Sequence, residues 1–240
     1  MKRRTFLWSA GAAAPVLAAM SDFPAPADEP GKLGTVALPK PKIQGGKPLL
    51  QALSERKTLR NIGAAALPPQ TLSNLLWAAF GVNRPDGKRT APSARNIQDI
   101  DIYVFLPEGV YVYDAVGNSL KPVLAGDQRA KAARQAPAPA AGAAARPATL
   151  GPADVPVTLV YISDQDKAKP AGGRAPDPSA VNAWSNVHVG FIAQNVYLFA
   201  ASEGLASSFR ANVDPDALTA LLSLRPGQKA LYSHLIGFPS

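Results

Sequence analysis

The residues with the clearest capacity for chemistry are the cations of a short segment that follows an apolar turn. Arg56, Lys57 and Arg60 lie within five residues of one another, and Thr58 is among them. Guanidinium offers a planar fork for phosphate oxygens, ammonium a compact charge, and the threonine hydroxyl a neutral donor. Such a charge run also occurs at solvent-exposed helix ends, where cations complement the negative pole of the helix. The segment alone therefore predicts either a phosphate site or a solvated helix end.

A second candidate segment lies in the polar loop 83–95 and just beyond it. Pro92, Ser93 and Ala94 combine a residue without N–H and two small side chains, so a ring can approach the backbone closely. Asn96 both donates and accepts hydrogen bonds, which suits the mixed donors and acceptors on the edge of a heterocycle. An ordinary turn, in which Asn and Ser bond their own backbone, is the alternative.

The third candidate segment is Glu203, Gly204 and Leu205, which ends a long apolar stretch. Gly at this place is typical of a left-handed helix cap. A backbone N–H here would also stabilise negative charge on a bound ring. The two interpretations are compatible.

Taken in order, the three segments resemble motifs of the FMN-dependent nitroreductase family. Its first motif, Arg-(Arg/His)-Ser-x-(Arg/Lys), is matched by 56–60 with Thr58 in place of Ser, and its second, Pro-Ser-x-x-Asn-x-Gln, by 92–98. Its Glu-Gly pair is matched by residues 203 and 204. Residues 102–127 resemble the branch of azoline- and thiazole-forming dehydrogenases. The resemblance extends from Leu49 to Pro239.

The resemblance implies a homodimeric FMN oxidoreductase that exchanges two electrons with a small-molecule donor or acceptor. The first segment would hold the phosphate and ribityl chain, with Arg60 near the pyrimidine end. The second segment would contact the ring edge, and the third would line the redox side of the ring. The flavin carries the redox chemistry, so no side chain is assigned a catalytic role.

Two alternatives remain open, and the first of them comes from a departure from the family pattern. Family members commonly continue beyond Gly-(Tyr/Phe)-Pro with basic residues, whereas this sequence ends at Ser240. Phosphate binding is then expected to rest on the first segment and on an arginine such as Arg89 or Arg210. One alternative is a nitroreductase-fold protein with a weak or lost flavin site that binds a ligand. The other is a peptide dehydrogenase of the azoline type.

The N-terminal residues 1–27 predict a twin-arginine signal peptide. Arg3-Arg4 is followed by Phe6-Leu7 and a short, Ala-rich apolar run. That route exports folded proteins, so the flavin would be bound before export by the twin-arginine machinery, and a periplasmic or extracytoplasmic location is expected. An uncleaved anchor is the alternative. Residues 28–48 predict an extended arm, since they are rich in Pro and Gly.

Composition narrows the possible functions further. The 240 residues are 47% hydrophobic and include no Cys and two His, which excludes disulfides and thiolate metal sites and disfavours a His-based one. The net charge of +8 is compatible with nucleic acid, but no recognised nucleic-acid motif accompanies it. An anionic cofactor and a basic surface account for it more simply.

The order of apolar periodicities predicts an α+β domain over 49–240. Short helices come first, then a hairpin over 100–113, a buried strand over 155–162, the longest helix over 182–203, and further strands near 206–212 and 229–237. We expect a nitroreductase-like mixed central sheet with helices around the long one. Residues 130–152, dominated by Ala and Pro, predict a flexible insertion.

Overall fold

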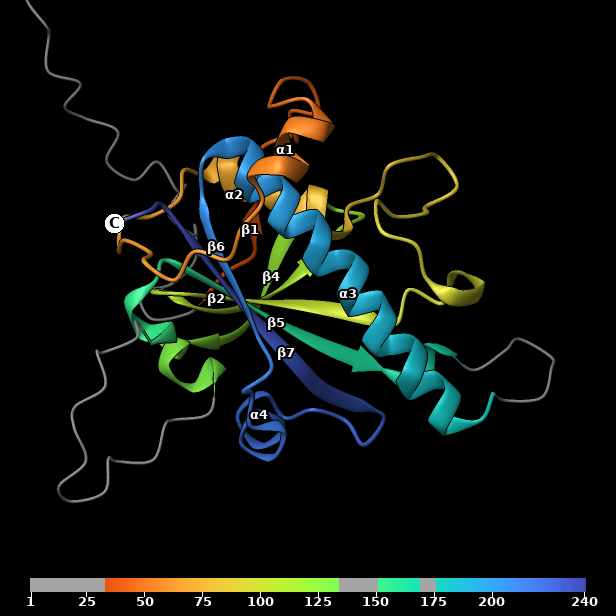
Figure 1. Cartoon of the computed structure of the whole chain (residues 1–240). Helices are drawn as coiled ribbons and strands as arrows, with labels where there is room; N and C mark the ends of the chain where they lie inside the picture. The colour runs from red at the N-terminus through yellow and green to blue at the C-terminus, as the bar shows by residue number, and fades with distance from the viewer. Residues whose placement is uncertain (1–32, 134–150, 169–175) are drawn as a thin grey trace, which may run out of the picture.

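A computed structural model describes residues 33–133, 151–168 and 176–240. The predicted signal peptide and most of the predicted insertion 130–152 lie outside these ranges, as do the first five residues of the predicted arm. The rest of the chain forms one α+β unit around a single sheet (Figure 1).

The sheet has seven strands in the described residues, and each hydrogen-bonded pair is antiparallel. Its spatial order is β1-β4-β3-β2-β5-β7-β6. The strands are β1 (Val36–Ala37), β2 (Ile100–Leu106), β3 (Gly109–Asp114), β4 (Ser119–Ala125), β5 (Val157–Asp164), β6 (Ala206–Arg210) and β7 (Gln228–Gly237). β5 and β6, which the long helix joins, run in the same direction, but β7 lies between them. This explains why a helical crossover produces no adjacent parallel pair.

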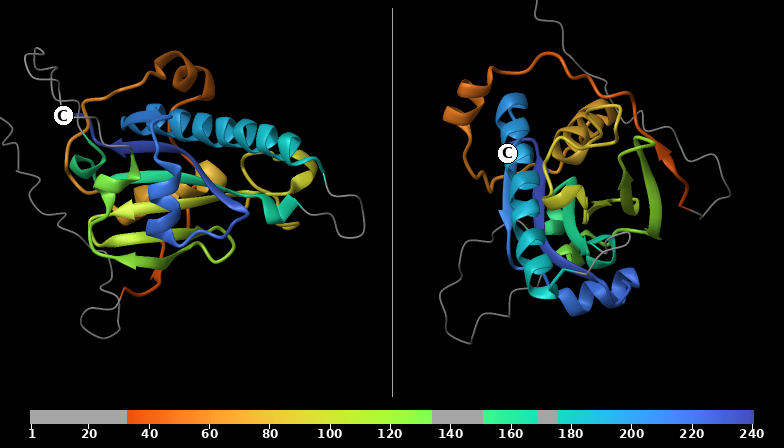
Figure 2. Two further views of the ribbon diagram at one scale, coloured as in Figure 1. Left: turned by 90° about the horizontal axis from the view of Figure 1, so that it is seen from below. Right: turned by 90° about the vertical axis from the view of Figure 1, so that its right-hand side faces the viewer.

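Within the described ranges, four α-helices surround the sheet: α1 (Leu49–Glu55), α2 (Pro69–Phe80), α3 (Pro178–Glu203) and α4 (Pro215–Leu222). Short 3₁₀ turns are η1 (Ala94–Asn96), η2 (Arg129–Ala132), η3 (Pro152–Asp154) and η4 (Gln165–Ala168). α2 and α3 cover one face, and α4 covers the other. Both views of Figure 2 place α1 on the far side of α3 from the sheet, so α1 is the outermost helix.

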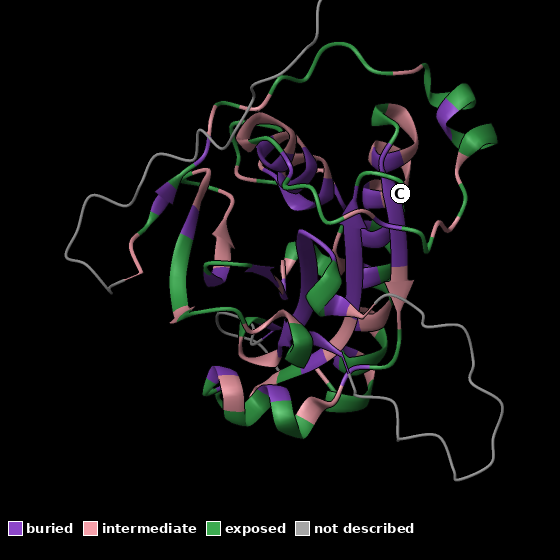
Figure 3. Cartoon of the chain, turned by 90° about the vertical axis from the view of Figure 1, so that its left-hand side faces the viewer, coloured by how far each residue is buried: buried purple, intermediate pink, exposed green. Residues whose placement is uncertain are grey.

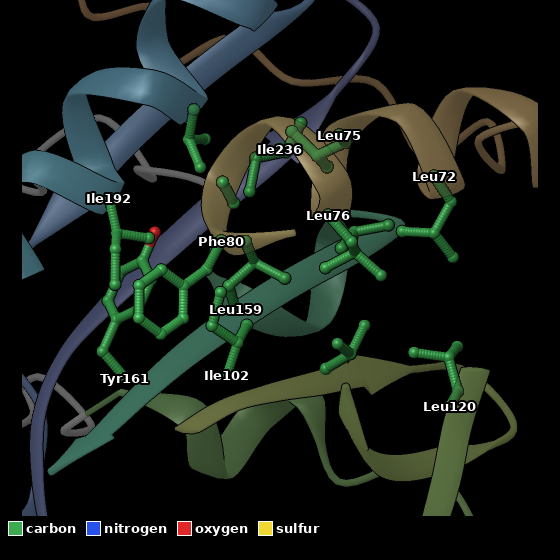
Figure 4. Close-up of a cluster of buried hydrophobic side chains, with 14 of the residues drawn as sticks. Leu72, Leu75, Leu76, Phe80, Ile102, Leu120, Leu159, Tyr161, Ile192 and Ile236 are labelled. Atoms are coloured by element: carbon green, nitrogen blue, oxygen red, sulfur yellow. The ribbon is translucent and has the colours of Figure 1, made fainter. Parts of the chain in front are cut away.

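The main core lies between α2, α3 and the sheet. Leu72, Leu75 and Leu76 of α2 are fully buried at the spacing that an amphipathic helix requires. They pack against Leu159 of β5 and Ile102 of β2, among others (Figure 4). This packing fixes α3 above the sheet, and α3 in turn carries the residues of the candidate site.

The expected α+β fold with a long helix is confirmed, and the structure adds detail. The long helix begins at Pro178, with Asp177 accepting a hydrogen bond from the Ser179 N–H as its N-cap. Within the predicted arm, Val36 and Ala37 form an edge strand against β4. α1 is largely exposed (Figure 3). Among its large hydrophobic side chains, Leu50 is the most exposed, at 79%. No helix in the described ranges is long and apolar enough to cross a membrane.

Candidate functional site

The cationic segment opens onto a cleft of about 340 Å³ beside the C-terminal half of α3. One wall comes from the end of α1 and the residues after it, and the other from the last turns of α3 and the turn that follows. The lining residues are Lys47, Ser54, Glu55, Arg56, Lys57, Leu59, Tyr197, Ala200, Ala201, Gly204 and Leu205. Two of the three predicted segments therefore share one cleft in a single chain.

Arg56 and Lys57 bring positive charge to this cleft, which the carboxylate of Glu55 also lines. Among the described residues, neither has an ion-pair partner. The guanidinium carbon of Arg56 lies 5.4 Å from the ring centre of Tyr197, a cation–π arrangement that orients the arginine. A cation held on an aromatic face with its N–H groups uncommitted is suited to bind an anion.

Tyr197 also fixes the backbone around the segment. Its hydroxyl lies 3.0 Å from Thr58 Oγ1 and accepts the Phe209 N–H of β6 at 2.9 Å. Leu59 donates its N–H to the Ser207 carbonyl on the same strand, at 3.0 Å. Thr58 is thus committed to a protein partner rather than open to solvent. The cationic segment is tied directly to the edge strand at Leu59, and at Thr58 it is tied through the Tyr197 hydroxyl of α3.

Beneath this contact lies a buried polar chain centred on His234 of β7. Its Nε2 is 2.7 Å from Ser207 Oγ, and its Nδ1 is 3.1 Å from the hydroxyl of Tyr161. The ring centre of His234 lies 4.8 Å from that of Tyr197, with the two rings tilted at 57° to each other. Burial lowers the pKa of His234 to about 3, because charge is disfavoured away from water. The imidazole is therefore neutral at neutral pH and acts as a structural support.

Lys47, which belongs to the predicted arm 28–48, also lines the cleft. Its N–H donates to Ser202 Oγ at 2.8 Å, and its ammonium group contacts both Glu55 and the Ala201 carbonyl. A cation at the last carbonyls of a helix satisfies groups that have no intrahelical partner. Lys47 thereby joins the arm, α1 and α3.

The turn after α3 is shaped by Gly204, which caps the helix in the left-handed conformation at φ 71°. The N–H groups of Gly204 and Leu205 both point to the Ala200 carbonyl. Glu203, which precedes them, is exposed and does not line this cleft. The turn thus offers a ring an open surface at Gly204, where a Cβ would meet nothing within 4 Å.

Arg60 lies close to Arg210 of β6. Burial, and next the neighbouring guanidinium of Arg60, lower the pKa of Arg210. Neither residue lines the cleft, but both belong to the surface that β6 shares with the cationic segment. Arg89 lies elsewhere, over the ring of Phe80 and bonded to Gln98. Of the two arginines considered as phosphate partners, only Arg210 adjoins the first segment.

The second predicted segment forms a strained turn at η1. Arg95, Asn96 and Gln98 all have positive φ, at 51°, 55° and 48°, although none is Gly. Conformations of this kind persist where the surrounding structure imposes them, and they are frequent at functional sites. Ser93 Oγ accepts the Gln98 N–H at 3.0 Å, which closes the turn. Pro92 and Asn96 are exposed.

A buried pair from α3 and the start of β2 reaches the same turn. His188 Nε2 accepts the Ala94 N–H at 2.7 Å, and His188 Nδ1 lies 2.5 Å from the Asp99 carboxylate. Ser185 donates to the other carboxylate oxygen. Burial acts to raise the pKa of Asp99, but the hydrogen bonds from His188 and Ser185 outweigh it, so that the pKa is lowered. His188 is 2% exposed and Asp99 0%.

Within one chain, the second segment lies apart from the other two. His188, which holds the turn, precedes Gly204 on α3 by about 24 Å along the helix axis. The structure therefore brings Arg56, Lys57, Gly204 and Leu205 together, with Thr58 behind them. It leaves Pro92, Ser93, Ala94 and Asn96 beside the N-terminal half of α3, at His188.

Lys47, Tyr197 and Asp99 were not singled out in the sequence. Lys47 belongs to a Pro- and Gly-rich arm, Tyr197 to a uniformly apolar helix, and Asp99 to an apparent loop-to-strand boundary. Nothing in those patterns indicates a site. Throughout the described part of the chain, no cluster of His, Asp and Glu suits a metal ion.

The geometry and the three motifs together define a protein of the nitroreductase class. The family model described as "Nitroreductase family" matches residues 53–238, and the chain belongs to this family of oxidoreductases. A protein of Methanocaldococcus jannaschii named as a nitroreductase is 28% identical over 182 residues, covering 72% of this chain and 82% of that protein.

Two solved structures have a fold similar to that of this chain. A nitroreductase structure from Ralstonia eutropha superposes with a TM-score of 0.73 and 32% identity, covering 86% of this chain and 90% of that one. The Escherichia coli microcin synthetase McbBCD complex contains a chain with a TM-score of 0.59 and 18% identity, covering 78% of this chain and 71% of that one. At that identity the second likeness shows the fold alone.

Proposed function

We propose that this protein is an FMN-dependent oxidoreductase that transfers two electrons to or from a small molecule. The observation that carries the proposal is the cleft in which Arg56 and Lys57 face the glycine turn after α3. A phosphate beside the cationic wall and a flat ring beside the glycine turn would use both walls of that cleft. Membership of the nitroreductase family supports the same cofactor.

The residues present fit FMN in charge and in shape. Arg56, oriented on Tyr197, and Lys57 would hold the phosphate, with Thr58 positioning the backbone through the Tyr197 hydroxyl. Ala200 and Leu205 supply apolar surface, and Gly204 leaves room for the ring. When bound, FMN supplies the two-electron chemistry, and the protein contributes binding, orientation and electrostatics. Arg60, with Arg210 beside it, would place positive charge near the pyrimidine end.

The Pro92–Asn96 turn enters this proposal through a second copy of the chain. α3 leaves an apolar stripe exposed, with Val187 at 54% and Phe191 at 44% exposure. A Cβ at Gly190, between them, would meet nothing within 4 Å, so a second helix could approach closely there. In a homodimer built on this face, the turn of one copy would approach the cleft of the other and contact the edge of the ring.

We further propose that the protein acts outside the cytoplasm. The twin-arginine start of the sequence supports this, since that route carries folded proteins with their cofactors in place. Nicotinamide donors are scarce outside the cytoplasm, so the electron donor would be of another class.

The test is flavin uptake by the full chain. Protein purified from cytoplasm with riboflavin supplied should be yellow, and flavin-free protein should quench FMN fluorescence on titration. Arg56→Ala should raise the Kd for FMN by at least tenfold, because it removes a charge-assisted hydrogen bond to phosphate. Lys121→Ala, a cation of β4 that pairs with Asp114 away from the cleft, is the control. A colourless protein that takes up no FMN would instead support a ligand-binding role.

A further inference from the structure

The hydrogen bond between Ala94 and His188 fixes the protonation of the imidazole. Because the Ala94 N–H donates to Nε2, that nitrogen carries no hydrogen. The ring is then neutral with its hydrogen on Nδ1, where it donates to the Asp99 carboxylate. Ser185 completes the carboxylate's partners from one turn earlier on α3. The imidazole cannot act as a general base, since its only lone pair is occupied and it is 2% exposed.

The Ala94–His188 hydrogen bond joins residues much farther apart in the sequence than the other hydrogen bonds that hold the turn do. Ser93 and Gln98 bond within the turn, and Gln98 also bonds the nearby loop at Gly87 and Arg89. These contacts define the shape of the turn. The Ala94–His188 bond joins residues 94 positions apart and ties the turn backbone to α3. Arg95 lies over the Trp184 ring at 5.4 Å, but this contact is made by a long, exposed side chain.

We propose that His188, held in one tautomer by Asp99, is a positioning residue that sets the Pro92–Asn96 turn relative to α3. This rests on the proposed function, in which the turn of one copy contacts the flavin of the other across the α3 face. A turn that contributes to a site in another subunit must be placed relative to the shared helix. A strained turn also needs support from outside itself, and Arg95 and Asn96 in this turn, like Gln98 just after it, have positive φ. His188 provides both.

The experiment compares variants that keep or remove the hydrogen bonds. His188→Phe retains a ring but has no acceptor for Ala94. Asp99→Leu removes the acceptor for Nδ1–H, whereas Asp99→Asn can accept that hydrogen and donate to Ser185, whose hydroxyl is already 3.0 Å from the Val181 carbonyl. Phe105→Leu, on the sheet face that packs against α4, is the control for a general loss of stability.

Two measurements on the full chain separate this proposal from the proposed function. In flavin-free protein, hydrogen exchange over 92–98 should accelerate at least tenfold in His188→Phe and Asp99→Leu. It should stay within about threefold of wild type in Asp99→Asn and Phe105→Leu. In the same proteins, the Kd for FMN should rise at least tenfold for the first two variants only. Ring ¹⁵N shifts of wild type should show hydrogen on Nδ1 of His188.

The outcomes are distinct. Unchanged exchange over 92–98 in His188→Phe would overturn the positioning role, as would faster exchange with unchanged FMN affinity. An equal loss of affinity in Phe105→Leu would reduce the effect to general stability and overturn it as well. Failure of wild type to bind FMN would overturn the proposed function and the flavin role of the turn, whatever exchange shows.

Discussion

At the residue scale, Tyr197 connects most of the candidate site. One side chain supports the guanidinium of Arg56 with its ring and holds Thr58 and Phe209 with its hydroxyl. Its ring also packs on that of His234. The residues proposed to bind the cofactor are therefore oriented by a side chain that itself lines the cleft. Loss of the hydroxyl and loss of the ring should have separable effects.

We expect Tyr197→Phe to destabilise the protein by about 1–3 kcal/mol, because a partly buried N–H and a hydroxyl lose their partner. FMN affinity should fall severalfold through the displaced segment 56–60, while the platform for Arg56 remains. Urea unfolding and FMN titration measure the two effects. Tyr232→Phe, which loses a 2.8 Å bond to Asn186 away from the cleft, is the matched control. Equal loss of FMN affinity in both variants would contradict this role.

How far the residues of the site could be predicted depended on the kind of signal. The cationic segment and the glycine turn stood out because their residue types are unusual in a short stretch. Tyr197 and Asp99 could not be found, because their roles arise from contacts with partners 139 and 89 positions away, respectively. His188 gave no periodic signal of its own. Its partners depend on which face of α3 meets the start of β2.

At the element scale, β7 places a neutral histidine under the cleft. His234 is fully buried, and its imidazole bonds β6 through Ser207 and β5 through Tyr161. The strands β5, β7 and β6 are thus joined by side chains as well as by backbone bonds. The apolar runs of the sequence predict these strands but do not predict their spatial order in the sheet. β7 comes last in the chain but lies between β5 and β6, a pairing of distant segments that local periodicity does not encode.

We expect this histidine to make stability fall with acid. Its pKa of about 3 in the folded state lies below the ordinary value of 6.5, so the unfolded chain binds a proton first. Stability is then fully present above pH 6.5 and is lost as pH falls toward 3. Between pH 7 and 5 the loss from this residue is about 2 kcal/mol. Urea unfolding of wild type should show that slope, and His234→Gln should lack it. Parallel curves for the two proteins would contradict the assignment.

At the scale of the whole molecule, the two parts of the proposed site lie beside different halves of α3. The cleft with Arg56 is near its C-terminus, and the turn with Asn96 is near its N-terminal half. An antiparallel pairing of two copies along the exposed stripe of α3 would bring the cleft of one copy toward the turn of the other.

We expect Phe191→Asp to give a monomer with low flavin occupancy but little change in stability, since Phe191 is 44% exposed. Sedimentation and flavin content test this, with Val116→Asp in the β3–β4 turn as the control.

A mixed dimer tests the same arrangement more directly. Arg56→Ala impairs the cleft, and Asn96→Asp keeps the shape of the turn but removes its donor, so each homodimer should hold little flavin. If each site combines the cleft of one chain with the turn of the other, a heterodimer of the two variants contains one intact site and one doubly altered site. Heterodimers isolated by two different tags should then hold about half the flavin of wild type, because one of every two sites is complete. If both parts of a site came from the same chain, each site would carry one defect and the heterodimer would stay as empty as its parents.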